Sequence, residues 1–283
     1  MIPTAFEYRR AGSVTEALSL LQEGGPEAKL LAGGHSLIPM MKQRLAEPGL
    51  LIDIGGLDEL RGIQEDGGEI AIGAAMTHAE IAASDLLRAQ APIVAETAAN
   101  IGDAQVRNRG TIGGSLAHAD PGADLPAVMV ALDATIALLG PNGERKVQAE
   151  DFFQDILTVD LAEDEIVTGV CFQACRSAAY AKLEQRASKF ALVGVAAALS
   201  LDGGTCSSAR VAVTGASSHA QRLSGVEGAL AGASLPDGAA SAASGAGDAL
   251  DFVNEDLHGS EEYRRAMTAV FARRAIEAAA GRS

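Results

Sequence analysis

The chain has 283 residues, of which 48% are hydrophobic, and a formal net charge of −15 at pH 7. This length and composition are typical of a globular α/β or α+β protein, and the length favours two domains. The acidic balance argues against nucleic-acid binding, which depends on Lys and Arg side chains that neutralise phosphates.

Neither a signal peptide nor a membrane anchor is predicted. The first residues lack a basic stretch followed by an apolar one, and no segment approaches ~20 uninterrupted apolar residues. Cys171, Cys175 and Cys206 are too few and too scattered for a disulfide framework or a four-thiolate metal cluster. We therefore expect buried thiols in a protein of the reducing cytoplasm.

A compact βαβαβ unit is predicted at the start of the chain. Ser13 followed by Glu16 is typical of a helix N-terminus. The predicted elements, in order, are a strand at residues 3–8, a helix at 14–21, a strand at 29–32, a helix from residue 37 and a strand at 50–54.

The rest of the chain changes character near residue 178. Before it we expect short strands and turns over 57–85, helices at 86–100 and 125–132, and strands at 134–139 and 166–172. Asp120 is the predicted cap of the second helix, with Pro121 at its first position. After it we expect strands at 179–184, 192–201 and 208–214, a small-residue stretch at 231–247 and a helix at 261–280.

Two glycine-rich segments about eighty residues apart are the main candidates for a binding site. Gly33-Gly34 follows a predicted strand, and Gly113-Gly114 precedes Ser115. Adjacent glycines can adopt positive φ and turn their N–H groups toward an anion. Each pair alone is equally compatible with an ordinary tight turn, and neither matches the Rossmann or P-loop motifs. Together they suggest two walls around one diphosphate.

Other polar residues near these segments have simpler interpretations than catalysis. A metal site at His118, Asp120 and Asp124 is not favoured, because their spacing matches no known ligand pattern. Asp124 is either a solvated helix residue or an acceptor for a ribose or an adenine amine. His35 has no orienting acid nearby, so we expect it to lie beside a ligand rather than act as a base.

The two segments with their flanks resemble a known pair of signatures. Ala-Gly-Gly-His-Ser-Leu-Ile-Pro-Met-Met-Lys at residues 32–42 and Gln-Val-Arg-Asn-Arg-Gly-Thr-Ile-Gly-Gly-Ser at 105–115 are similar to the FAD signatures of the medium subunits of the molybdenum hydroxylase (xanthine dehydrogenase) family, closest to the carbon monoxide dehydrogenase branch. The resemblance implies an α+β protein with a two-subdomain FAD-binding fold of the vanillyl-alcohol oxidase type at residues 1–177 (subdomains about 1–55 and 56–177). A C-terminal domain of a small antiparallel sheet plus a helical cluster would follow at 178–283.

The resemblance also implies a set of FAD contacts. Residues 31–37 and 111–115 would hold the diphosphate and adjoining flavin. Phe190 falls near the position that covers one face of the isoalloxazine, and it lacks the polar group that the aromatic residue there often has in the carbon monoxide enzymes. Ser115 departs from the asparagine of the xanthine-oxidising relatives. The implied cofactor-binding residues are Leu31, Ala32, Gly33, Gly34, His35, Ser36, Leu37, Ile101, Gly102, Thr111, Ile112, Gly113, Gly114, Ser115, Asp120, Asp124, Val167, Lys182 and Phe190. No catalytic or metal-binding residue is expected.

The implied function is electron transfer through FAD inside a larger enzyme. A small subunit would carry [2Fe–2S] clusters, a large subunit would carry the molybdopterin, and this chain would pass electrons to quinone, oxygen or NAD. The resemblance favours a dimer of heterotrimers in the cytoplasm, compatible with peripheral attachment at the inner face of the membrane. The substrate stays open between carbon monoxide, aldehydes, purines and N-heterocycles. Two alternatives are a stand-alone flavin oxidoreductase of the same fold and a non-enzymatic nucleotide-binding module.

Overall fold

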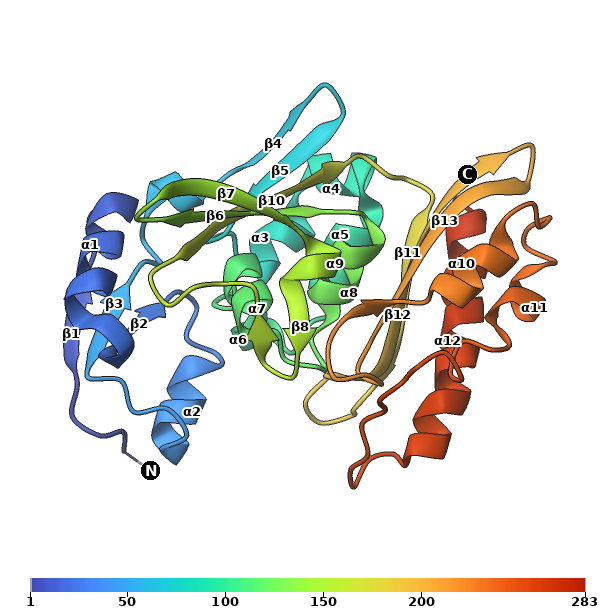
Figure 1. Cartoon of the computed structure of the whole chain (residues 1–283). Coiled ribbons are helices and arrows are strands. Elements are labelled where there is room, and N and C mark those ends of the chain that lie inside the picture. The colour runs from blue at the N-terminus through green and yellow to red at the C-terminus, as the bar shows by residue number, and fades with distance from the viewer. Residues whose placement is uncertain (1, 283) are drawn as a thin grey trace.

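The computed structural model describes residues 2–282, and its three larger sheets follow one another along the chain (Figure 1). The first is a parallel sheet in the order β1-β3-β2. Its elements are β1 (Glu7–Arg10), α1 (Val14–Gly24), the 3-10 helix η1 (Gly25–Glu27), β2 (Ala28–Leu31), α2 (Leu37–Gln43) and β3 (Leu50–Asp53). The predicted βαβαβ unit is confirmed, and Ser13 caps α1 by accepting the N–H of Glu16. The first strand was predicted too early, because pairing with β3 begins only at Glu7.

The second sheet is antiparallel, in the order β4-β5-β10-β6-β7, and carries most of the helices. Its strands are β4 (Ile63–Asp66), β5 (Glu69–Gly73), β6 (Thr135–Gly140), β7 (Gly143–Gln148) and β10 (Ile166–Gln173), with a small hairpin of β8 (Phe153–Asp155) and β9 (Thr158–Val159). Its helices are η2 (Asp58–Leu60), α3 (His78–Ala83), α4 (Asp85–Gln90), α5 (Pro92–Ala99), α6 (Ala104–Arg107), α7 (Ile112–His118), α8 (Asp124–Ala131) and α9 (Ala149–Phe152).

Two helix predictions in this region are wrong, one in its interior and one at its start. The helix predicted over 86–100 is broken at Ala91, whose φ of −147° and ψ of 64° are not helical, and Pro92 after it disfavours the helical conformation at this position. Helix α8 begins at Asp124, not at Pro121. Asp120 instead closes a turn, because its Oδ1 accepts the N–H of Gly122 at 2.8 Å.

The third sheet is antiparallel and contains β11 (Ala178–Glu184), β12 (Ala191–Asp202), β13 (Thr205–Thr214) and β14 (Gln221–Arg222). Alternate residues of β12 enter two separate cores, as the period of a strand requires. Ala196 packs with α8 and the second sheet, whereas Val195 and Ala197 pack with the C-terminal helices α10 (Ser224–Leu230), α11 (Ala239–Ala243) and α12 (Glu261–Ala280). The sheet thus lies between α8 and α12 (Figure 1).

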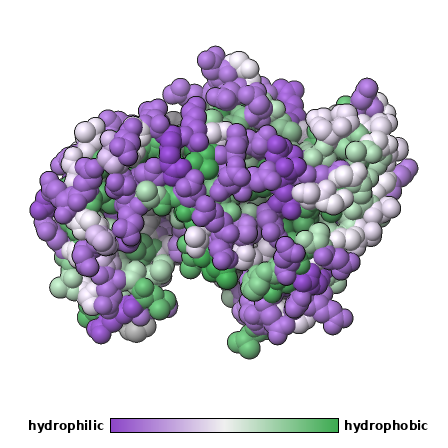
Figure 2. All heavy atoms as spheres, viewed as in Figure 1, coloured by the Kyte–Doolittle hydropathy of each residue, from purple (hydrophilic) through white to green (hydrophobic). Residues whose placement is uncertain are grey.

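The surface is largely hydrophilic on the face drawn in Figure 2. A notch at its lower edge separates α2 from the C-terminal lobe, and hydrophobic residues border it. Among residues 2–282, no helix combines the length and the apolar character needed to cross a bilayer.

Candidate functional site

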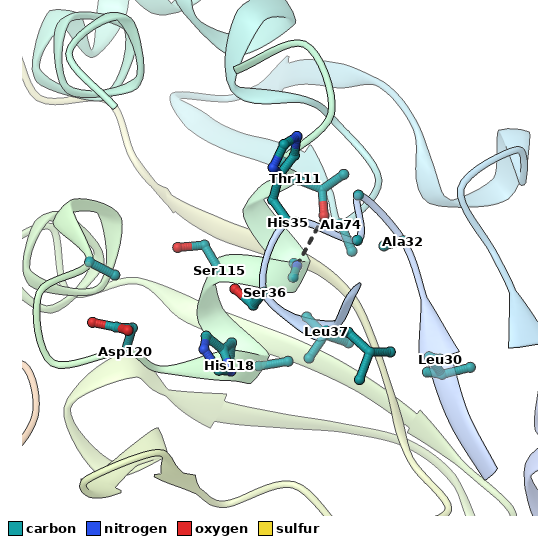
Figure 3. A pocket seen from close by; sticks show the side chains of 18 of the residues that line it. Leu30, Ala32, His35, Ser36, Leu37, Ala74, Thr111, Ser115, His118 and Asp120 are labelled. Atoms are coloured by element: carbon teal, nitrogen blue, oxygen red, sulfur yellow. Dashed lines mark hydrogen bonds between the residues drawn. The ribbon is translucent and has the colours of Figure 1, made fainter. Parts of the chain in front are cut away.

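A cavity of about 560 Å³ lies between loops that belong to each of the three larger sheets. Its walls come from the loop between β2 and α2, from helix α7 and the loops around it, and from the loop between β11 and β12. Figure 3 shows the loop with His35 and Ser36 facing helix α7, which carries Ser115 and His118. Every residue that the resemblance assigns to FAD lines this cavity except Ile112, which is fully buried, and Lys182.

The first glycine segment is an open anion nest. Gly34 has a φ of +75°, and the turn closes when the N–H of Ile38 donates to the Gly34 carbonyl. Within the described part of the chain, the N–H groups of residues 33–36 donate to no protein acceptor. Four successive N–H groups without a protein acceptor, in a loop that lines a cavity, are donors suited to phosphate oxygens.

The second glycine segment is built differently, and the prediction of a second nest there is wrong. Gly113 and Gly114 lie in the first turn of α7 and do not have positive φ. The N–H groups of residues 112–115 all have protein acceptors, among them Thr111 Oγ1, which lies 3.1 Å from the Gly114 nitrogen. Gly113 serves close packing, since an added Cβ would lie 2.5 Å from the Cβ of Ala74. In this segment the hydroxyl groups of Thr111 and Ser115 are therefore available to a ligand, whereas the backbone N–H groups are not.

The two segments are in direct contact. A Cβ added to Gly33 would overlap the carbonyl oxygen of Arg109 and lie 2.9 Å from Gly110 Cα. Glycine at position 33 thus lets the nest lie against the segment that leads into α7. The segment between α5 and α6 is also held in place, because the Arg107 side chain donates to the carbonyls of Ile101 and Gly102, each at 3.0 Å.

A buried ion pair joins Asp124, which lines the cavity, to Lys182, which does not. Asp124 is only 4% exposed, which excludes its alternative interpretation as a solvated helix residue. Its Oδ2 lies 3.0 Å from Lys182 Nζ, and its Oδ1 accepts the Tyr180 hydroxyl at 2.6 Å. Burial raises the pKa of Asp124, while the Lys182 ammonium and the Tyr180 hydroxyl oppose that rise. Burial beside the same carboxylate raises the pKa of Tyr180.

His78 also lines the cavity, and the sequence analysis missed it. It is 5% exposed, and its Nδ1 is one of the buried polar atoms of the described chain that lack a partner. Burial, with a smaller contribution from His35, lowers its pKa to about 4, so the ring is neutral at pH 7. The Thr77–Glu80 capping box could have placed it in the first turn of a helix, but nothing in the sequence places that turn at the cavity.

Phe190 lies at the rim of the cavity, 49% exposed, in the loop that joins β11 to β12. Asp120, Ile101 and Val167 line the cavity as well. Within residues 2–282 the His, Cys, Asp and Glu side chains form no group of three or more that could hold a metal ion. The cavity thus combines an anion nest, apolar walls and one accessible aromatic ring.

Comparisons with known proteins agree with this geometry. Residues 4–172 match the family described as the FAD binding domain in molybdopterin dehydrogenase, and residues 178–279 match the CO dehydrogenase flavoprotein C-terminal domain. The chain is 42% identical to the carbon monoxide dehydrogenase medium chain of Hydrogenophaga pseudoflava, over 99% of this chain and 98% of that one. It is 38% identical to subunit alpha of the 6-hydroxypseudooxynicotine dehydrogenase complex of Paenarthrobacter nicotinovorans, over 100% and 97% of the two chains.

A solved structure agrees over the same length. The carbon monoxide dehydrogenase from Hydrogenophaga pseudoflava that lacks the Mo-pyranopterin moiety matches with a TM-score of 0.95 and 43% identity, covering 100% of this chain and 99% of that one. Both matched families and the full-length similarity concern flavin-carrying chains of molybdenum dehydrogenases. The chain belongs to the family of FAD-binding medium subunits of the molybdenum hydroxylases.

Proposed function

We propose that this chain takes electrons from the [2Fe–2S] clusters of a small subunit onto FAD and passes them to an external acceptor, in a complex similar to carbon monoxide dehydrogenase. The observation that carries the proposal is the row of free N–H groups at residues 33–36, which opens into a cavity that has an aromatic ring at its rim. When bound, FAD supplies the capacity to store one or two electrons, which no side chain of this protein has.

The residues of the cavity fit such a cofactor. The N–H groups of residues 33–36 suit a diphosphate, and the hydroxyls of Ser36 and Ser115 lie in the same cavity as further donors. Ile101 and Val167 offer apolar contacts, and Phe190 offers an aromatic face on which a flat ring can stack. The site therefore binds and orients the cofactor, and we assign no acid–base step to its side chains.

The assembly is part of the proposal. We expect a large molybdenum subunit and a small iron–sulfur subunit, joined as a dimer of heterotrimers in the cytoplasm, with quinone, oxygen or NAD as acceptor. The relatives named above belong to enzymes for carbon monoxide and for a nicotine derivative. Since chains so similar occur in enzymes for such different substrates, the large subunit must select the substrate. We place the domain boundary at residue 177, between the second and third sheets.

Reduction of the flavin in the reassembled complex tests the proposal. The chain with its bound FAD is mixed anaerobically with its large and small subunits, and carbon monoxide or an aldehyde is added. Loss of the visible flavin absorbance only when both partners are present supports the relay. Oxidised flavin beside fully reduced iron–sulfur clusters would contradict it. Reduction by substrate without partners would favour a stand-alone oxidoreductase, and binding of adenine nucleotides without FAD would favour the nucleotide-binding module.

A further inference from the structure

We propose that Lys182 is a positioning residue, which fixes the cavity wall and the Phe190 loop through hydrogen bonds within the protein and does not itself donate to the cofactor. The proposal concerns how the FAD site is built, and so it rests on the proposed function. We call the three hydrogen bonds of Lys182 Nζ the Lys182 latch.

All the hydrogen-bonding capacity of the ammonium group is used inside the protein. Lys182 Nζ donates to the carbonyl oxygens of Asn100 and Lys189, at 3.0 and 2.9 Å, and to Asp124 Oδ2 at 3.0 Å. An ammonium has three N–H groups, so none remains for a ligand. The side chain is 7% exposed and does not line the cavity. Its effect on a bound cofactor must therefore pass through the groups it holds.

The latch joins two backbone segments that do line the cavity. Asn100 directly precedes Ile101 and Gly102 in the wall. Lys189 directly precedes Phe190 at the rim. Because the peptide group is planar, fixing the Lys189 carbonyl also fixes the direction of the N–H of Phe190. The latch thereby sets where the aromatic side chain leaves the backbone.

The loop needs such a restraint. Lys189 has a φ of +66°, a conformation that residues with a Cβ rarely adopt. The loop is closed by the N–H of Lys189, which donates to the Gln185 carbonyl at 2.8 Å, and by the N–H of Gln185, which donates to the Phe190 carbonyl at 2.8 Å. Phe190 itself is half exposed, and its N–H donates to Ser188 Oγ at 3.3 Å. Lys182 adds a buried, charge-assisted hydrogen bond to this small loop.

The carboxylate end of the latch is held in turn by Tyr180. Gly194, which pairs with Lys182 across β11 and β12, makes room for this phenol. A Cβ at position 194 would overlap the Tyr180 hydroxyl and lie 2.7 Å from its Cζ. Gly194 does not line the cavity. Replacing it by alanine therefore disturbs the support of Asp124 without touching the cofactor's surface.

A double-mutant cycle in the whole chain tests the proposal. FAD is titrated by flavin fluorescence into the apoprotein of wild type, Lys182→Met, Phe190→Ala and the double variant, with exposed Lys146→Met as control. If Lys182 acts through the Phe190 loop, Lys182→Met weakens FAD binding by about tenfold, within the range of coupled neighbours, and adding Phe190→Ala weakens it no further. Losses that multiply in the double variant overturn the proposal.

Hydrogen exchange gives a second measurement that does not depend on FAD. In the apoprotein, Lys182→Met and Gly194→Ala should both speed exchange of the backbone amides at residues 185–191, while Lys146→Met should not. Unchanged exchange there in Lys182→Met overturns the latch, whether or not FAD binds. If Lys182→Met does not fold because Asp124 is left unpaired, Lys182→Met with Asp124→Asn carries the exchange measurement alone, because Asp124 itself lines the cavity and its replacement can change FAD affinity directly. Failure of the wild type to bind FAD would instead contradict the proposed function.

Discussion

Replacing Gly33 by alanine should weaken FAD binding by separating the two glycine segments. The added Cβ would overlap the Arg109 carbonyl oxygen and lie 2.8 Å from its carbon, so the segments must part by several tenths of an ångström or more. Overpacking of this kind costs about 1–3 kcal/mol. Since every 1.4 kcal/mol is a factor of ten, we expect FAD affinity to fall by roughly 5- to 150-fold if the cost falls on the cofactor-binding arrangement.

The assay is a fluorescence titration of FAD into apoprotein, paired with urea unfolding. Gly228→Ala in α10 is the matched control, because a Cβ there meets nothing within 4 Å. Alanine is also the better helix former, so this variant should bind FAD normally and be equally or more stable. Equal FAD affinity of Gly33→Ala and wild type would refute the contact between the segments as a condition for binding.

The remaining predictions concern other groups around the cavity. Lowering the pH from about 6.5 to about 4 should destabilise the protein through His78, because this histidine takes up a proton in the unfolded chain but stays neutral in the fold. The loss is at most about 3.4 kcal/mol, and urea unfolding of His78→Leu should lack this part of the pH dependence. Arg145→Met should lower the free energy of unfolding in urea by about 1–3 kcal/mol, because Arg145 donates to both Asp160 and Glu165. It should also speed hydrogen exchange of the backbone amides at residues 160–165. As a control, Arg273→Met at an exposed ion pair should change the free energy of unfolding by less than about 0.5 kcal/mol. Gly114→Val should abolish FAD retention, because its Cβ would lie 2.9 Å from Thr111 Oγ1 and its side chain would occupy the cavity wall; normal flavin content in the purified variant would contradict this.

Local patterns in the sequence were enough to predict the parts of the fold that depend on neighbours along the chain. The strand before Gly33 and the cap at Ser13 are examples, since both rest on periodicity and on hydrogen bonds within one turn. The start of α8 could not be predicted in this way. Asp120 and Pro121 are typical helix-start residues, but the peptide segment after them is drawn into a turn by the C-terminal sheet.

The sequence predicted the residues of the site better than it predicted the hydrogen bonds that they make. A glycine pair does not reveal whether its N–H groups stay free, because that depends on distant acceptors such as the Ala74 carbonyl, which takes the N–H of Gly113. The resemblance supplied Asp124 and Lys182, but not Tyr180, which supports them. A tyrosine in a strand pattern indicates only that one face is buried, and its polar partner follows from tertiary packing.

The C-terminal sheet also helps to build the cavity that we propose holds FAD. The turn before α8 contributes Asp120 to the cavity, and it is tied to one end of that sheet, where β12 begins and β13 ends. Thr214 Oγ1 donates to the Pro121 carbonyl at 2.8 Å, and the N–H of Ala191 donates to the Gly122 carbonyl at 3.0 Å.

Helix α8 joins the two regions further. All its residues are buried, and it packs against both the helices of the second sheet and the strands of the third. A chain that ended at residue 177 would therefore expose an apolar helix, release the turn before it and lose Phe190 and the Lys182 latch together. The nest at residues 33–36 could still meet a phosphate in such a fragment, but nothing in it would hold the wall and rim opposite. Tight FAD binding should for this reason require the C-terminal domain, even though the glycine segments lie wholly outside it.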